Sequence, residues 1–407
     1  MPNIALFSGT FSKEEPVVQS LQDVGYKLFA DKDIVARASN ISGIAENKVA
    51  RAFSDKTSVF NKFTHEKERS IAYLRLALAE ILAEDKLLIL GFVSHLVPLE
   101  ISNVLRVCLI ADMKFRIADA AAELGLTEKE AVSLIHKQDE ARADWVNIIM
   151  KERDPWAPSL YDMVIPADKT DKDEGVALII EHLDNDLLKS TDASKKAVQD
   201  FLLQATAGVA LAKEGHNVDV NAKDGLLTLT INKHVLMLSR LKDELKSIAE
   251  RVAGVKSVAT RVGKNYYQAD IYRKHNFEMP SKVLLVDDER EFVQTLSERL
   301  LMRDMGSAVA YDGESALQLV EEDEPEVMIL DLKMPGIDGI GVLKRVKATC
   351  PQIEVIILTG HGSEKDRKIC MDLGAFAYLQ KPVDINILTE TLKKANEKIS
   401  VAKAEKR

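Results

Sequence analysis

The sequence lacks several features that mark whole classes of protein. It has only three cysteines in 407 residues, and Cys108, Cys350 and Cys370 are scattered without metal-ligand spacing. We therefore expect reduced, structural cysteines in a cytoplasmic protein, and no metal site built on them. No apolar run approaches the roughly 18–20 residues that cross a bilayer. The N-terminus also lacks the basic and apolar segments of a signal peptide.

An excess of basic residues is also missing. The formal net charge is −9, which argues against nonspecific binding to nucleic acid or to anionic membranes, because both reward clustered Lys and Arg. We expect no DNA binding and no membrane insertion. Apolar residues make up 46% of the chain and charged residues 29%, as in globular proteins. A chain of 407 residues is too long for one hydrophobic core, so several domains are expected.

The first block of the chain alternates short apolar runs with longer helical stretches. The helical stretches include residues 66–83 and a helix opening at Thr127, where Thr127 and Glu130 have the spacing of a capping box. Such alternation predicts an α/β layer fold with a parallel sheet. The strands predicted for this sheet are Ile4–Phe7, Leu87–Leu90, Val104–Ile110 and Met163–Ile165.

A polar linker of about residues 184–192 precedes a block with a different rhythm. A helix through Val198–Ala205 comes first, and a helix with an apolar face from Leu238 to Val252 follows later and ends near Gly254. The order is therefore αββαβ, a small α+β module with a hairpin turn at residues 222–225. Its predicted strands are His216–Asn221, Leu226–Ile231 and Ser257–Val262.

In the final block, polar residues follow four buried-strand runs. The runs are Lys282–Val286, Val327–Leu330, Glu354–Leu358 and Ala377–Leu379. In an open parallel sheet, ligands bind at the carboxyl ends of the strands. Side chains that follow these runs should therefore converge in one pocket. They are Asp287, Asp288, Asp331, Thr359 and Lys381.

The residue types in this predicted pocket suit phosphoryl transfer. Clustered carboxylates repel one another unless a hard cation binds between them, and Mg²⁺ prefers oxygen ligands. Asp331 is the natural nucleophile. Asp288 would bind Mg²⁺ directly and Asp287 largely through water. Lys381 would pair with the phosphoryl oxygens and Thr359 would hydrogen-bond to one of them, which neutralises charge on the transferring group.

These residues resemble the receiver domain of two-component response regulators, over residues 281–403. The resemblance implies a flavodoxin-like, doubly wound (βα)5 fold and a phosphohistidine donor on a sensor histidine kinase or phosphotransfer protein. It implies that the backbone carbonyl of Lys333 completes the Mg²⁺ ligands, and that Thr359 and Tyr378 form a switch pair. It also allows a homodimer through this block. A receiver that cannot be phosphorylated, or a Tyr378 that is an ordinary half-buried aromatic, are the alternatives.

The first block, residues 1–185, resembles the cytidylate kinase-like branch of the P-loop nucleotide kinases. The segments that carry the resemblance are Tyr26–Phe29 with Asp31–Asp33, Leu87–Gly91, Val104–Val107 through Lys114–Ile117, Leu124–Thr127 through Asp139–Arg142, and Tyr161–Ile165. The resemblance implies an α/β fold of the P-loop kinase type. Its nucleotide-binding positions would be Gly9, Lys13, Arg116, Asp139 and Arg142.

The phosphate loop of this block departs from a working one. Such a loop needs glycines, so that backbone N–H groups can wrap the phosphates, and a Lys followed by Ser or Thr. The segment Ser8–Glu14 has one glycine, and Glu14 follows Lys13 where Ser or Thr is needed. We therefore expect a scaffold or a ligand-sensing domain rather than an active kinase. Arg116, Asp139 and Arg142 can equally be helix residues in salt bridges.

The middle block, residues 192–273, resembles a BON module. The segments that carry this resemblance are Lys223–Leu229 and Val252–Val258. BON modules are associated with binding membranes or other ligands, often outside the cytoplasm. The block has no catalytic cluster, and we interpret it as a binding or dimerisation module.

Together the blocks predict a signalling protein whose switch is Asp331. No DNA-binding helix-turn-helix follows the last block, so we expect signalling through the N-terminal modules or a partner. Two other hypotheses remain open. One is a nucleoside monophosphate kinase regulated by the receiver, and the other is a non-enzymatic scaffold assembled through the middle module.

Overall fold

The chain forms two compact units, each with one five-stranded parallel sheet. The computed structural model describes residues 1–54, 61–233, 235, 238–264, 266, 279–280, 282–301, 303, 305–360 and 362–405. The first unit holds the described residues of Met1–Thr57, Lys67–Lys213 and Val218–Asp270. The second holds those of Ser58–Glu66, Glu214–Asn217 and Ile271–Arg407.

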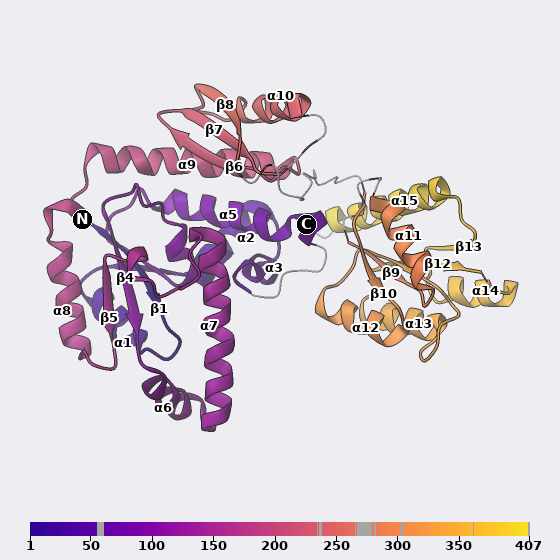
Figure 1. The fold of residues 1–407 in the computed structure, drawn as a ribbon, viewed down its shortest axis with the longest axis horizontal. Coiled ribbons are helices and arrows are strands. Elements are labelled where there is room, and N and C mark those ends of the chain that lie inside the picture. The colour runs from indigo at the N-terminus through magenta and orange to yellow at the C-terminus, as the bar shows by residue number, and fades with distance from the viewer. Residues whose placement is uncertain are drawn as a thin grey trace. The chain divides into compact units, whose positions relative to one another are not determined.

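The sheet of the first unit has the strand order β2-β3-β1-β4-β5 (Figure 1). The prediction of a parallel sheet is confirmed, and four strands lie where the sequence predicts them. The prediction missed β2, because this short edge strand is only partly buried and has a weak apolar pattern. The strands are β1 (Asn3–Ser8), β2 (Lys27–Ala30), β3 (Leu87–Leu90), β4 (Val104–Ile110) and β5 (Met163–Pro166).

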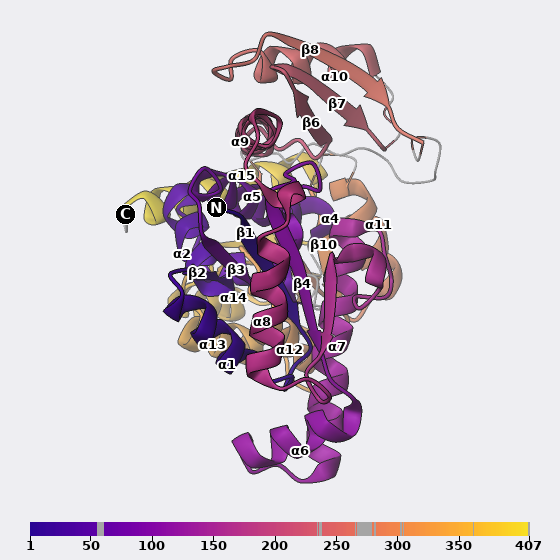
Figure 2. The same ribbon diagram turned by 90° about the vertical axis from the view of Figure 1, so that its left-hand side faces the viewer.

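Helices connect these strands, and one of them carries the predicted cap. The N–H of Glu130 donates to the Thr127 hydroxyl, and the N–H of Thr127 donates to the Glu130 carboxylate at 2.9 Å. Helix α6 and the start of α7 extend away from the sheet (Figures 1 and 2). The helices up to residue 190 are α1 (Glu14–Asp23), α2 (Asp31–Ser42), α3 (Glu46–Ala50), α4 (Asn61–Thr64), α5 (Glu66–Ile81), α6 (Met113–Leu124), α7 (Glu128–Met150) and α8 (Lys172–Leu183), with short 3-10 turns η1 (Arg51–Phe53), η2 (Phe92–Leu96), η3 (Pro158–Leu160) and η4 (Asp186–Leu188).

The middle block has the predicted αββαβ order. Its first strand begins three residues later than predicted, while its other two strands match the prediction. Asp224 and Gly225 form the turn between β6 and β7 with φ values of 59° and 84°, which suits a tight hairpin. The elements are α9 (Asp192–Lys213), β6 (Asp219–Lys223), β7 (Leu226–Ile231), α10 (Leu238–Ala249) and β8 (Ser257–Val262).

Helix α9 shares a hydrophobic core with the first block. Val198, Phe201, Ala205 and Val209 belong to the same buried cluster as the apolar side chains of α5 and Trp145. Both views show α9 lying beside α5 (Figures 1 and 2). The blocks predicted as 1–185 and 192–273 therefore fold as one compact unit. The predicted boundary residues 273 and 281 lie outside the described residues.

The second unit has the strand order β10-β9-β11-β12-β13, which is the flavodoxin-like order 2-1-3-4-5. Two buried clusters lie on opposite faces of the sheet. Helices α11 and α15 cover one face, and α12, α13 and α14 cover the other. The predicted doubly wound fold is confirmed. Its elements are β9 (Val283–Val286), α11 (Arg290–Leu301), β10 (Ser307–Ala310), α12 (Gly313–Glu322), β11 (Val327–Leu330), α13 (Gly339–Thr349), β12 (Glu354–Thr359), α14 (Glu364–Asp372), β13 (Ala377–Gln380) and α15 (Ile385–Glu405).

Two predictions about what the chain lacks can be compared with these elements. None of the helices in the described ranges is both long enough and apolar enough to cross a membrane. The three cysteines are unpaired, and Cys108 and Cys370 are buried. Cys350 is only partly buried, and the reduced state of the thiols stays a prediction.

Candidate functional site

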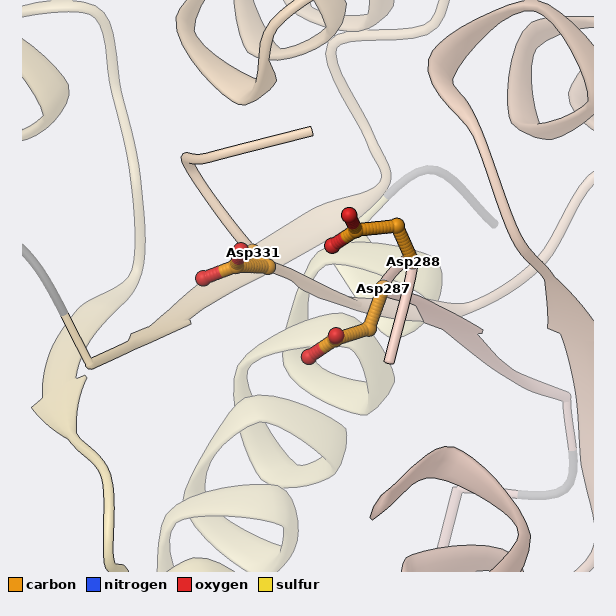
Figure 3. Close-up of side chains that lie close together, drawn as sticks. All are labelled: Asp287, Asp288 and Asp331. Carbon is orange, nitrogen blue, oxygen red and sulfur yellow. The ribbon is translucent and has the colours of Figure 1, made fainter. Parts of the chain in front are cut away.

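Three carboxylates meet at one edge of the sheet in the second unit. Strands β9 and β11 pair in parallel with Val286 opposite Leu330, so the residues that follow them begin side by side. Those residues are Asp287, Asp288 and Asp331, and each offers an oxygen within 4.8 Å of the others (Figure 3). The structure therefore brings together the acidic residues that the sequence predicts to converge.

The three carboxylates differ in burial and in partners. Asp287 and Asp331 are 4% and 5% exposed, whereas Asp288 is exposed. Burial raises the pKa of Asp287, and the nearby Asp331 adds to this, while hydrogen bonds from Lys381 and from the Glu289 N–H oppose it. The Oδ1 atom of Asp331 is buried and has no hydrogen-bond partner among the described residues. Asp331 therefore has a buried oxygen that no group of the described residues satisfies.

Lys381 reaches this cluster from the end of β13. Its Nζ lies 2.6 Å from Asp287 Oδ2 and 3.0 Å from Glu289 Oε1. Burial by itself lowers the pKa of the ammonium group, but the hydrogen bonds to Asp287 and Glu289 outweigh burial, so the net shift of the pKa is upward. Lys381 is therefore charged, and it stands beside Asp287 rather than on Asp331.

Thr359 and Tyr378 lie close to the same strand ends. Thr359 ends β12 and is fully buried, and its carbonyl accepts the Lys381 N–H at 3.0 Å. The Tyr378 hydroxyl is buried without a hydrogen-bond partner among the described residues. A Cβ placed on Gly362 would lie 1.7 Å from this hydroxyl and 3.0 Å from Thr359 Cγ2. The two predicted switch residues therefore flank the same glycine.

The loop after β11 holds Asp331 in place. The Lys333 N–H donates to Asp331 Oδ2 at 3.1 Å. A Cβ on Gly339 would lie 2.0 Å from the Asp331 carbonyl oxygen, so the start of α13 can approach only because residue 339 is glycine. The Lys333 carbonyl remains a predicted metal ligand.

A pocket of about 270 Å³ lies in the first unit, at the carboxyl ends of β1, β2 and β3. Its charged lining includes Glu14, Asp31 and Arg142. Burial raises the pKa of Asp31 to about 6; N–H groups of Val93 and Phe92 and the charge of Arg142 oppose this, and Glu14 adds to it. The pocket combines opposite charges with the aromatic side chains of Phe7 and Phe92.

The residues predicted to bind a nucleotide are mostly engaged by the protein itself. Arg116 pairs with both carboxylate oxygens of Asp139, at 2.9 and 2.7 Å, and its Nε donates to the Thr10 carbonyl. Lys13 turns toward α6, where its Nζ lies 3.8 Å from Asp119. Arg142 lines the pocket, and its Nε donates to the Ser8 carbonyl at 2.9 Å.

Gly9, the remaining predicted nucleotide-binding position, stands at the start of the same loop. Its N–H donates to the Leu109 carbonyl of β4 at 2.9 Å. Of the five predicted positions, only Arg142 lines the pocket. Their role toward a nucleotide therefore stays a prediction.

Comparison with known proteins assigns the second unit to a family. Residues 283–393 match the model of the response regulator receiver domain. Sporulation initiation phosphotransferase F of Bacillus subtilis is 35% identical over 116 residues, which make up 28% of this chain and 94% of that protein. The chain belongs to the response regulator receiver family. Its receiver is also similar to the transcriptional regulatory protein CpxR of Escherichia coli, 46% identical over 102 residues, or 25% of this chain and 43% of that protein.

Two further similarities complete the comparison. A solved response regulator receiver domain protein from Clostridium thermocellum is 32% identical, with 30% of this chain and 98% of that chain covered and a TM-score of 0.29. Residues 21–169 match the model of the cytidylate kinase-like family, a match that begins after Glu14. The chain spans less than half the length of the first curated relatives it matches.

Receiver domains generally use Mg²⁺ for phosphorylation, and the carboxylates of this receiver fit that ion. The donor set consists only of oxygens, and one of them, Asp331 Oδ1, is buried and has no partner in the part of the chain that the structure describes. Asp288 and Asp331 would hold the ion, because Asp287 already accepts the Glu289 N–H with one oxygen and pairs with Lys381 through the other. Bound there, Mg²⁺ would offset the charge of the carboxylates and of an incoming phosphoryl group.

The sequence missed two residues that stand out in the structure. Glu289 contacts Lys381, but three acidic residues in a row at 287–289 do not reveal which of them turns toward a distant lysine. Asp31 lines the pocket of the first unit directly after β2. A polar residue directly after a strand can indicate a site residue, but the sequence pattern did not predict β2 and so gave Asp31 no such place.

Proposed function

We propose that this protein is a response regulator of a two-component phosphorelay and accepts a phosphoryl group on Asp331. The observation that carries the proposal is the buried Oδ1 of Asp331, which has no hydrogen-bond partner in the described ranges and lies beside two further carboxylates and a lysine. A buried carboxylate oxygen without a partner costs free energy, so its persistence favours a chemical role.

In the proposed reaction, the donor is a phosphohistidine on a sensor histidine kinase or a phosphotransfer protein. A carboxylate oxygen of Asp331 attacks phosphorus, the P–N bond to the imidazole breaks, and the imidazole nitrogen keeps the electron pair and takes up a proton. Lys381 and Thr359 would contact the phosphoryl oxygens. Asp288, Asp331 and the Lys333 carbonyl would provide the direct Mg²⁺ ligands, and Asp287 would act largely through water.

We propose that the output passes through the N-terminal modules or a partner rather than through DNA binding. Thr359 and Tyr378 would form the switch. In support, the Tyr378 hydroxyl lies buried beside Gly362, near Thr359, without a hydrogen-bond partner among the described residues. A movement of Thr359 toward a phosphoryl group would change the space next to that hydroxyl. A homodimer through the receiver stays a prediction.

Phosphoryl acceptance can be tested by incubating the full chain with a small acyl phosphate and Mg²⁺. We expect one phosphoryl group per chain by intact mass, in a base-labile bond, because an aspartyl phosphate is an acyl phosphate. Asp331→Asn should abolish the label, and removal of Mg²⁺ with a chelator should reduce it strongly, since the ion neutralises the transferring group.

Asp372→Asn is the matched control, because Asp372 is an exposed carboxylate of the same receiver at the end of α14. This variant should label like the wild type. An unlabelled wild-type protein, or a label that survives in Asp331→Asn, would contradict the proposed function.

We further propose that the pocket of the first unit binds a small ligand without transferring a phosphoryl group. The match of residues 21–169 to the cytidylate kinase-like family and the charged pocket favour ligand binding. Glu14, which accepts a hydrogen bond from Ser8 and lines the pocket, disfavours a polyphosphate by its charge. Arg116 is already paired with Asp139, so its guanidinium is not available for phosphates.

Calorimetry on the full chain separates the remaining hypotheses. We expect no binding of ATP and no ADP formation when ATP and cytidine monophosphate are mixed with the protein. ADP formation would instead support a nucleotide kinase regulated by the receiver. If neither nucleotide binds, two hypotheses remain. The pocket then binds another ligand, or the protein is a scaffold assembled through the middle module.

A further inference from the structure

The charged end of Lys381 is enclosed by three side chains that follow β9. Besides the contacts to Asp287 at 2.6 Å and Glu289 at 3.0 Å, its Nζ lies 4.3 Å from the centroid of the Phe292 ring. The ring face attracts the ammonium group through its quadrupole. We refer to Asp287, Glu289 and Phe292 as the lysine cage.

The lysine cage holds Lys381 apart from the acceptor. Within the part of the chain that the structure describes, no ion pair joins Lys381 to Asp331, and Asp331 Oδ1 has no hydrogen-bond partner. To contact a phosphoryl group on Asp331, the ammonium group has to turn away from at least part of the cage. The energy of the cage contacts therefore contributes to the barrier of that step.

We propose that Glu289 is a positioning residue of the receiver, which holds Lys381 in the lysine cage before phosphorylation and thereby slows phosphoryl acceptance by Asp331. This inference rests on the proposed function. Glu289 acts through Lys381: in the described ranges its side chain pairs with Lys381 and forms no hydrogen bond or ion pair with Asp331.

Glu289 suits this role better than the other members of the cage. Asp287 is buried and accepts the Glu289 N–H at 3.0 Å, so its carboxylate has little room to move away from Lys381. The side chain of Glu289 is 66% exposed and can move into solvent when the lysine leaves. An exposed ion pair is weak, so its loss should change a rate by a small factor rather than abolish the reaction.

The test compares rates of labelling by a small acyl phosphate at saturating Mg²⁺, so that a change in cation affinity does not contribute. Glu289→Gln keeps the shape of the side chain and removes its charge. We expect labelling about two- to fivefold faster than wild type, which corresponds to the loss of one exposed ion pair. Glu291→Gln is the matched control: Glu291 is also exposed and lies in the first turn of α11, but it makes no contact with Lys381 within the described ranges.

A second measurement distinguishes positioning from a general effect of charge or folding. With isotope-labelled lysine, the side-chain ammonium resonance of Lys381 should shift in Glu289→Gln and stay unchanged in Glu291→Gln. In a Lys381→Met background, Glu289→Gln should no longer alter the labelling rate, because its effect passes through the lysine.

Three results would overturn the inference. If the wild type labels and Glu289→Gln labels at the rate of Glu291→Gln, or more slowly, Glu289 does not hold the lysine back, while the proposed function stands. An effect that persists in the Lys381→Met background shows that Glu289 acts by another route. A wild-type protein that takes no label removes the proposed function together with this inference.

Discussion

Two carboxylates at strand ends, Asp331 and Asp31, differ in what surrounds them. Both oxygens of Asp31 accept backbone N–H groups, from Phe92 at 3.1 Å and from Val93 at 2.9 Å. Asp331 accepts one N–H with Oδ2 and leaves Oδ1 without a partner among the described residues. Asp31 is therefore committed to holding the turn after β3, whereas Asp331 is available for chemistry.

The raised pKa of Asp31 predicts a pH-dependent stability of the first unit. Burial raises the pKa to about 6 from 3.8. The folded state thus binds the proton more tightly than the unfolded state. The resulting stabilisation is complete below pH 3.8 and is lost as the pH rises through 6. Replacing Asp31 with Asn removes this titration. As the pH rises, the free energy of unfolding of the variant should therefore increase relative to that of the wild type, by on the order of 2–3 kcal/mol.

This shift can be measured by urea unfolding at several pH values, followed by tryptophan fluorescence. Both tryptophans of the chain, Trp145 and Trp156, lie in the first unit, so the signal reports on that unit alone. Asp23→Asn, at the exposed end of α1, is the control and should keep the wild-type pH dependence. A constant difference between Asp31→Asn and wild type across this range would show that folding does not shift the pKa of Asp31, and would contradict the prediction.

The sequence indicates which side chains lie near one another in the receiver where a strand run leads directly into them. Asp287, Asp331, Thr359 and Lys381 each stand at or just beyond a strand end, and strand order in a parallel sheet brings such ends together. Glu289 lies one residue before α11, and its contact with Lys381 spans 92 positions. Local patterns contain no information about such a contact, because it depends on side-chain direction.

At the scale of elements, the loop between β1 and α1 has a backbone conformation and contacts that disfavour a phosphate site. Phe11 and Lys13 have positive φ values of 58° and 49° without being glycine, a conformation that costs free energy in most side chains. Two arginines hold this loop by donating to its carbonyls, Arg116 to Thr10 and Arg142 to Ser8. The carbonyl oxygens of this loop therefore accept hydrogen bonds from two guanidinium groups that could otherwise bind an anion.

The two strands that the sequence missed are both short and lie at sheet edges. β2 and β10 have four residues each and lie at the edge of their sheets. Neither is uniformly buried, because an edge strand has a neighbour on one side only. Central strands such as β9 and β11 are fully buried and read as continuous apolar runs, which makes them easy to predict.

At the scale of the whole molecule, the packing of α9 determines which blocks of the chain share a compact unit. The polar stretch around residues 184–192 indicates a linker, yet α9 buries an apolar face in the core of the first block. Sequence alone could not reveal this, because an amphipathic helix shows that it has a buried face but not which partner covers it. The middle block therefore depends on the first block for part of its core.

The shared core makes a prediction about cooperativity. Phe201 is 3% exposed and belongs to the same buried cluster as Trp145. Phe201→Ala should destabilise the first unit by about 3–5 kcal/mol, the usual cost of removing a buried aromatic ring. Because Trp145 lies in the same cluster, the midpoint of urea unfolding followed by tryptophan fluorescence should be lower in Phe201→Ala than in the wild type.

The matched control is Leu202→Ala, one position along the same helix, where the side chain is 38% exposed. It should leave the midpoint close to wild type, since little apolar surface is lost there. If the middle block were an independent domain, Phe201→Ala would unfold α9 and its sheet alone. The tryptophan transition would then stay at the wild-type midpoint while the helical circular dichroism signal fell earlier, and that result would contradict the shared core.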